Sequence, residues 1–161
     1  MLAAGLLAAC GGSNTNTNTA REKAMEDAAA AHGIDADVTV NDAGETEKIE
    51  IKAGGGTVGR NLDLPAGFPD DINLPADWEV IAASSPMPGA HSVQILSGST
   101  RDEIMQALRS RLTETGWSET SADVPAPSMA RLGFEKGDRM ASFNIIENGE
   151  TRAVQVLTMP K

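Results

Sequence analysis

The sequence predicts an α+β protein built on an antiparallel sheet. Short strand-like runs are separated by turn residues, and Gly137-Asp138 and Asn148-Gly149 are typical of two-residue hairpin turns. One helix with marked ends is expected at Thr100–Thr115, where its apolar stripe would pack against the sheet. Hydrophobic residues make up 40% of the 161 residues but include only three Phe, two Trp and no Tyr, so aliphatic side chains must form most of the core.

Residues 20–61 read as a small helix followed by a β-hairpin. Ala20–His32 is rich in alanine and mixed in charge, and a glycine follows it, so we expect a short helix with a thin apolar face. Asp37–Asn41 and Glu45–Ala53 read as paired strands, and Thr57–Arg60 as a brief third strand. The three consecutive glycines before this last strand lack the Lys-Ser/Thr ending of a phosphate-binding loop, so they predict a turn.

Residues 62–77 form a proline-rich bridging segment. Its prolines favour extended backbone and remove hydrogen-bond donors, so neither a helix nor an internal strand is expected there. We expect the segment to pack four apolar side chains against the core, namely Leu64, Phe68, Ile72 and Leu74.

Residues 78–161 are expected to form the main α+β domain, which begins with two strands. Trp78–Ala83 and Ser92–Leu96 carry the strand pattern, and Ser84–Gly89 connects them.

The helix that follows has clear start and stop signals. Thr100 and Glu103 fit a capping box, in which a hydroxyl and a carboxylate accept hydrogen bonds from free backbone N–H groups. The buried stripe is predicted from apolar residues that recur every four positions: Ile104, Leu108 and Leu112. Gly116 suits a left-handed closing position, and Trp117 is then expected to pack back on Leu112.

The last strands are predicted from their two turns. The Gly137-Asp138 turn places Leu132 opposite Phe143, and the Asn148-Gly149 turn places Phe143 opposite Val154. Both pairings put the apolar side chains on one face, whereas a slip by one residue would bury the polar set. We therefore expect a three-stranded antiparallel meander with one apolar face packed against the helix.

The first ten residues carry the most specific motif of the chain. Met1–Ala9 is uncharged and apolar, and Leu7-Ala8-Ala9-Cys10 resembles the lipobox of bacterial lipoproteins. The resemblance implies that residues 1–9 are a signal peptide, that cleavage follows Ala9, and that Cys10 receives lipid through its thiol, with palmitate among the acyl chains. Two or three acyl chains hold a protein at a membrane far more firmly than one chain does.

This leader departs from the family pattern in one respect. A secretory signal normally begins with Lys or Arg before an apolar stretch of about 7–15 residues, and no basic residue precedes this stretch. We expect the natural start to lie upstream of Met1; the alternative is an ordinary N-terminal helix. The run is too short for a transmembrane span, which needs about 20 apolar residues.

Residues 10–19 are expected to be the lipidated cysteine and a polar tether. Gly11–Thr19 contains only Gly, Ser, Asn and Thr, a composition typical of spacers that reach about 15–18 Å over nine residues. Gly11 after the cysteine resembles the outer-membrane pattern of enterobacterial lipoproteins. The run Leu64–Asp70, with Leu74-Pro75 after it, also resembles a segment of small envelope lipoproteins of unassigned role, and it implies no activity.

Charge and composition exclude several functions. The net charge of −10 disfavours binding to nucleic acid or to anionic lipid through a basic patch, so a covalent anchor is needed for membrane attachment. One cysteine with two histidines cannot complete a structural zinc site, and no metal or cofactor is expected. His32 and His91 lack a nucleophile-elbow serine and are interpreted as surface or capping residues, so no catalytic residue is predicted.

The sequence therefore predicts a non-enzymatic envelope lipoprotein, anchored by Cys10 and facing the periplasm, that binds an envelope protein or another envelope component. The alternative is a tethered small-molecule carrier or sensor with a pocket between helix and sheet. A hydrolase is the third and least favoured hypothesis, because it requires a polar cluster that the sequence does not assemble.

Overall fold

A computed structural model of the chain describes residues 15–52 and 55–161. These ranges hold two helices and nine strands, which in chain order are α1 (Thr15–Ala31), β1 (Ala36–Val40), β2 (Thr46–Ile51), β3 (Gly56–Gly59), β4 (Glu79–Met87), β5 (Ala90–Ser97), α2 (Arg101–Glu114), β6 (Ser118–Ala126), β7 (Met129–Lys136), β8 (Arg139–Asn148) and β9 (Thr151–Pro160).

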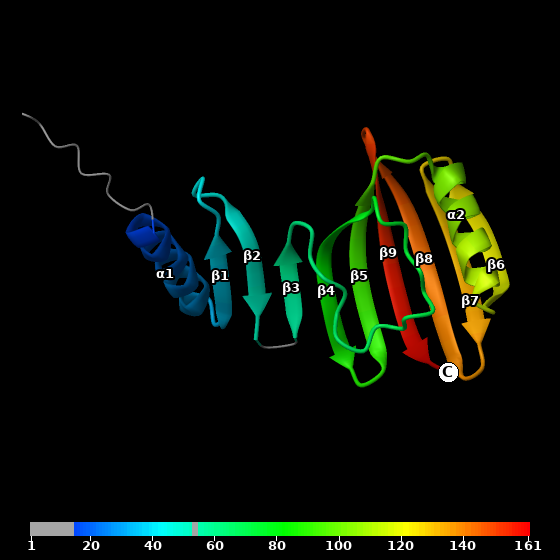
Figure 1. Cartoon of the computed structure of the whole chain (residues 1–161), viewed down its shortest axis with the longest axis horizontal. Helices are drawn as coiled ribbons and strands as arrows, with labels where there is room; N and C mark the ends of the chain where they lie inside the picture. Colours follow the sequence, from blue (N-terminus) through cyan, green and yellow to red (C-terminus); the bar gives the residue numbers. More distant parts are fainter. Residues whose placement is uncertain (1–14, 53–54) are drawn as a thin grey trace, which may run out of the picture.

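The nine strands form one antiparallel sheet in the order β1-β2-β3-β4-β5-β9-β8-β7-β6 (Figure 1). The α+β class is confirmed, although the sheet dominates the fold. The sequence predicts a helix–hairpin segment separate from the main sheet. In the structure β3 pairs with β4, so the N-terminal hairpin continues directly into the main sheet. The central join is the pairing of β5 with β9, which connects strands far apart in sequence.

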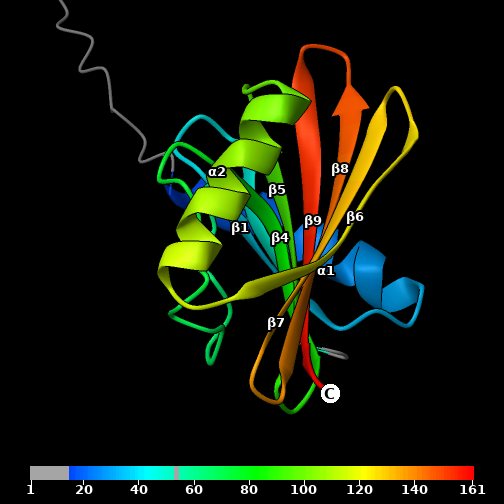
Figure 2. The same cartoon turned by 90° about the vertical axis from the view of Figure 1, so that its right-hand side faces the viewer.

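The two helices lie on opposite faces and at opposite ends of the sheet (Figures 1 and 2). Helix α2 covers the C-terminal strands, and its buried stripe is confirmed, since Ile104, Leu108 and Leu112 are at most 1% exposed. The predicted capping box is present at Thr100 and Glu103. Beyond the helix Gly116 has φ +86°, and the Trp117 N–H donates to the Leu112 carbonyl at 2.9 Å, as predicted for the closing turn.

The C-terminal meander is confirmed in its faces and corrected in one register. Leu132 lies opposite Phe143, as predicted. In the last hairpin, however, Phe143 lies opposite Val156 and not Val154. The two central turn residues are Gly149 and Glu150, one position later than predicted. Gly149 alone takes a positive φ (+65°), which fits a turn with glycine at its first central position.

The meander also has a fourth strand that the sequence does not predict. Strand β6 is almost entirely exposed and carries no alternation of apolar and polar residues, so it lacks the pattern that marks a half-buried strand. It is nevertheless paired with β7 and forms one edge of the sheet. Strand β4 likewise runs through most of the predicted Ser84–Gly89 connection, and Met87 pairs with Ala90 across the turn.

Helix α1 begins at Thr15, five residues earlier than predicted, so it takes in the second half of the segment interpreted as a tether. Ala9, Cys10 and the first part of that segment lie outside the described residues, as does the Ala53-Gly54 pair between β2 and β3. The hairpin of β1 and β2 is confirmed.

Candidate functional site

The proline-rich segment of residues 62–77, here called the strap, crosses the α2 side of the sheet in front of β4, β5 and β9 (Figure 1). Phe68 and Ile72 join the main core, and Leu74 packs beside it, as predicted. Leu64 is 40% exposed, so its predicted place in the core is wrong. Leu64 is exposed because it lies near the start of the strap and lines two surface hollows.

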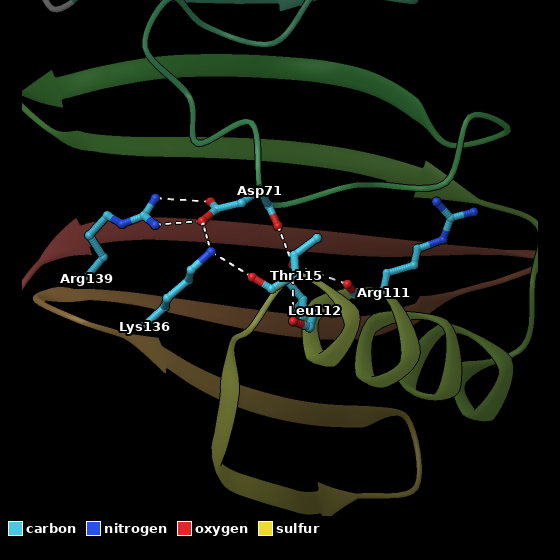
Figure 3. Close-up of polar contacts among 6 residues, drawn as sticks. All are labelled: Asp71, Arg111, Leu112, Thr115, Lys136 and Arg139. Carbon is cyan, nitrogen blue, oxygen red and sulfur yellow. Dashed lines mark hydrogen bonds and ion pairs between the residues drawn. The ribbon is translucent and has the colours of Figure 1, made fainter.

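One carboxylate, that of Asp71, holds the middle of the strap to the rest of the fold. Asp71 receives a two-pronged hydrogen bond from the Arg139 guanidinium, at 3.0 and 2.6 Å, and a third bond from Lys136 Nζ at 2.6 Å (Figure 3). The Thr115 hydroxyl donates to the Asp71 backbone carbonyl at 2.7 Å, and Lys136 also donates to the Thr115 carbonyl. We call Asp71, Thr115, Lys136 and Arg139 the latch, because these residues join the strap, the end of α2 and the β7–β8 hairpin.

The latch is electrostatically strong. The hydrogen bonds from Arg139, followed by those from Lys136, lower the pKa of Asp71 from 3.8 to about 2, even though partial burial opposes the shift. The Arg139 guanidinium also lies 5.1 Å from the centre of the Trp117 ring, within the range of a cation–π contact. No sequence pattern indicates this cluster, because Asp71 stands more than sixty positions before both Lys136 and Arg139.

The strap and the sheet line an open bowl of about 510 Å³. Val80 and Ile95 from the sheet line it together with the strap, and all of the lining residues are nonpolar except Asp70 and Asn73. Trp78 lines the bowl and is only 8% exposed, so it serves both the core and the cavity. The volume lies within the range of sites for small molecules.

The bowl is not where the sequence predicts a pocket. The space between α2 and the sheet is filled by the buried stripe of the helix and by the sheet side chains that meet it, such as Phe134 and Phe143. The hollow lies instead between strap and sheet. The strap is not extended as predicted, because each of its three prolines begins a turn in which its carbonyl accepts a hydrogen bond from the N–H three residues later, at Phe68, Ile72 and Trp78.

A second groove of about 660 Å³ lies next to the bowl, and Leu64 and Pro65 of the strap line both hollows. Ser85 lines it, and the Ser85 hydroxyl is 2.9 Å from Nδ1 of His91. The interpretation of His91 as a surface or capping residue is wrong, because it is only 5% exposed. Its ring packs edge-on against the Phe68 ring, with 6.0 Å between the two ring centres. Its ring bonds to a hydroxyl rather than a carboxylate, so the geometry does not supply the acid of a catalytic triad.

The described residues contain no group of three or more His, Cys, Asp or Glu side chains placed to hold a metal ion. Across residues 15–52 and 55–161, neither helix has both the length and the apolar character needed to cross a bilayer. The bowl and the neighbouring groove are two hollows of the described part that a ligand could enter.

Comparison with known proteins adds no relative. The chain matches no family model, no curated protein and no solved structure.

Proposed function

We propose that this protein is a membrane-anchored envelope lipoprotein whose folded part is a non-enzymatic binding module. The observation that carries the anchor is the motif Leu7-Ala8-Ala9-Cys10, followed closely by folded structure. Helix α1 begins at Thr15, the fifth residue after Cys10, and five residues span at most about 18 Å even when fully extended. A lipid on Cys10 would therefore hold the α1 end of the sheet beside the bilayer.

The acidic body supports a covalent anchor. A net charge of −10 gives the surface little attraction for anionic headgroups. A covalently bound lipid would supply the membrane affinity that the charge does not provide. The sheet has nine strands about 4.8 Å apart, so its β6 edge lies roughly 40 Å from its β1 edge. An anchor at the α1 end leaves the C-terminal end, with α2 and the latch, free to meet a partner in the envelope.

The anchor is tested by replacing the sulfur. Cys10→Ser, expressed in a bacterial host with its natural leader, should take up no labelled palmitate and should leave the detergent phase on Triton X-114 partitioning. Ser13→Ala, which keeps the cysteine, should behave as the unaltered protein. A Cys10→Ser protein that still carries label, or that still enters the detergent phase, would contradict the lipid anchor.

A second candidate function, a tethered small-molecule carrier or sensor, is favoured by the bowl. Residues 62–77 contain four aspartates and no basic residue, and only Asp71 among them has an ion-pair partner within the described part. Asp63, Asp70 and Asp77 are exposed, and Asp70 lines the bowl. A bowl lined by apolar side chains and by the carboxylate of Asp70, in a strap with no basic residue, fits a small organic cation with an apolar body.

Binding to the bowl can be followed through the fluorescence of Trp78, which lines it. Dodecyltrimethylammonium, kept below its micelle concentration, should change the tryptophan fluorescence saturably, and Trp78→Phe should abolish the change. Asp70→Asn should weaken binding severalfold, whereas Asp123→Asn, an exposed acid on β6, should not. Equal binding of dodecyl sulfate would contradict selection for a cation, and no saturable change would contradict the carrier function while leaving the anchor unaffected.

A further inference from the structure

The β1 edge of the sheet is covered by side chains of α1. The backbone N–H groups of Val38 and Val40 point away from β2, and each donates to a glutamate of α1. The Val38 N–H donates to Glu26 Oε1 at 3.1 Å, and the Val40 N–H donates to Glu22 Oε1 at 2.9 Å. The two carboxylates thus occupy the positions that carbonyl groups of a next strand would take.

The spacing explains why one helix can do this. Four residues advance about 6.0 Å along a helix, and two residues advance about 6.8 Å along a strand. Glu22 and Glu26 therefore match alternate N–H groups of an edge strand. The contact is also apolar, because the β1 side chains of Ala36, Val38 and Val40 are each only 7% exposed and α1 is the helix packed against this strand. Asn18 also donates to the Asn41 carbonyl, although no α1 side chain among residues 17–31 is fully buried.

The opposite edge is protected without such a cover. Strand β6 carries Pro125, which cannot donate, and two bulges whose extra residues lie on β6 itself. An antiparallel pairing of two β6 strands about Ser121 would also bring Glu119 opposite Asp123, which is unfavourable because the charges are alike. These features discourage another strand from adding to β6.

Strand β1 has none of these protections. It contains no proline, and the register shift in the β1–β2 pair places the extra residue, Glu47, on β2. Pairing two β1 strands about Val38 would bring Ala36 opposite Val40 and Asp37 opposite Thr39, with about six backbone hydrogen bonds and no like charges directly opposed. Once α1 no longer covers it, the β1 edge can pair with the same edge of a second chain.

We propose that the β1 edge is a strand-addition surface for a second copy of this chain, closed by Glu22 and Glu26 of α1. Release of α1 would let two chains join through β1 in a two-fold symmetric, continuous sheet. The proposal does not depend on the lipid anchor or on the bowl, since all of its contacts lie within residues 15–52.

The test removes the two acceptors and follows the oligomeric state. Glu22→Ala with Glu26→Ala keeps a strong helix former at both positions, so α1 itself is preserved. Sedimentation equilibrium should show dimerisation strengthened at least about tenfold, a free-energy difference near 1.4 kcal/mol. The matched control, Lys23→Ala with Asp27→Ala, removes an exposed ion pair of the same helix and should leave dimerisation unchanged.

A third substitution identifies the surface. Thr39→Asp, added to the double variant, would place a new carboxylate opposite Asp37 of the other copy twice in each dimer, and it should restore the monomer. The position is exposed and lies opposite Lys48 within the monomer, so the fold should tolerate the new charge. Far-UV circular dichroism and melting would confirm that each variant is folded.

Two results would overturn the proposal. One is a folded double variant that stays monomeric at about millimolar concentration, the range of the weakest specific complexes. The other is a dimer that Thr39→Asp does not disrupt, because the contact would then lie on another surface. If the double variant unfolds, Glu22→Gln with Glu26→Gln, which keeps weaker acceptors, must show the same direction of change or the proposal fails.

Discussion

The two helices of this protein are held to the two ends of one sheet in different ways. Helix α2 buries an apolar stripe, begins with a capping box, and carries acids in its first turn and Arg111 in its last turn. Helix α1 has neither charge pattern and no fully buried side chain among residues 17–31. It combines two glutamate contacts to the edge of β1 with packing against the buried Val38 and Val40 side chains, which lie outside the main core. Apolar burial contributes far more stability than exposed polar contacts do, so the α2 end should be the more stable one.

The same contrast applies to the two edges. Strand β6 protects itself through proline, bulges and charge, whereas β1 depends on a neighbouring helix. The helix with no fully buried side chain among residues 17–31 therefore covers the edge that has no proline or bulge residue of its own. A protein arranged in this way can expose β1 without disturbing the core beneath α2 and the strap.

The largest expected effect on stability comes from removing a buried apolar side chain of α2. Leu108→Ala should lower the free energy of unfolding by about 2–5 kcal/mol, because it leaves a cavity beneath a fully buried side chain. Met25→Ala, the matched change on α1, should cost less than about 0.5–1 kcal/mol, since Met25 is 37% exposed. Urea denaturation measures both, and equal losses would remove the distinction between the helices.

The next effect concerns the latch, which strengthens the C-terminal end. Asp71→Asn should cost about 1–2 kcal/mol near neutral pH, a modest value because the carboxylate is partly exposed. The folded protein lowers the pKa of Asp71 from 3.8 to about 2, so this stabilisation is complete well above pH 4 and is lost as the pH falls toward 2. Melting temperatures of the two proteins should therefore converge between pH 5 and about pH 2; a constant difference would show that the charge is not the cause.

An effect similar to that of the latch, or smaller, is expected at the start of α2. Thr100→Ala removes the hydroxyl of the capping box and should cost about 0.5–2 kcal/mol. The Thr100 backbone N–H and then its hydroxyl hold the pKa of Glu103 below its ordinary value, so the substitution should raise that pKa part of the way back. Side-chain carbon NMR titration follows Glu103 directly, and an unchanged titration would mean that the hydroxyl does not support the carboxylate.

Local patterns predicted the C-terminal half of the fold well. The period of Leu108 and its neighbours predicts α2, and the Gly137-Asp138 turn predicts the pairing of Leu132 with Phe143. The last hairpin shows the limit of such reasoning. Moving its turn by one residue shifts each pair by two positions and keeps the same face, so hydrophobic pattern alone could not choose between the registers.

The remaining features depend on contacts between distant residues. Joining β3 to β4 requires knowledge of where the strap runs, and Asp71 gains Arg139 as a partner only in the folded chain. The cover on β1 was missed for the same reason, because a glutamate on an exposed helix ordinarily reads as a solvated charge. The bowl could not be predicted, because a proline-rich sequence indicates local backbone conformation and not which parts of the sheet the segment will face.

Native-state hydrogen exchange tests the central contrast most directly. The N–H groups of Val38 and Val40 should exchange through local opening of the α1 end, whereas those of Val154 and Val156 in the middle of the sheet should exchange only through global unfolding. We expect markedly lower protection at β1, with a denaturant dependence near zero. Equal protection factors with the same denaturant dependence at both places would mean that the two ends unfold together, which would contradict this account.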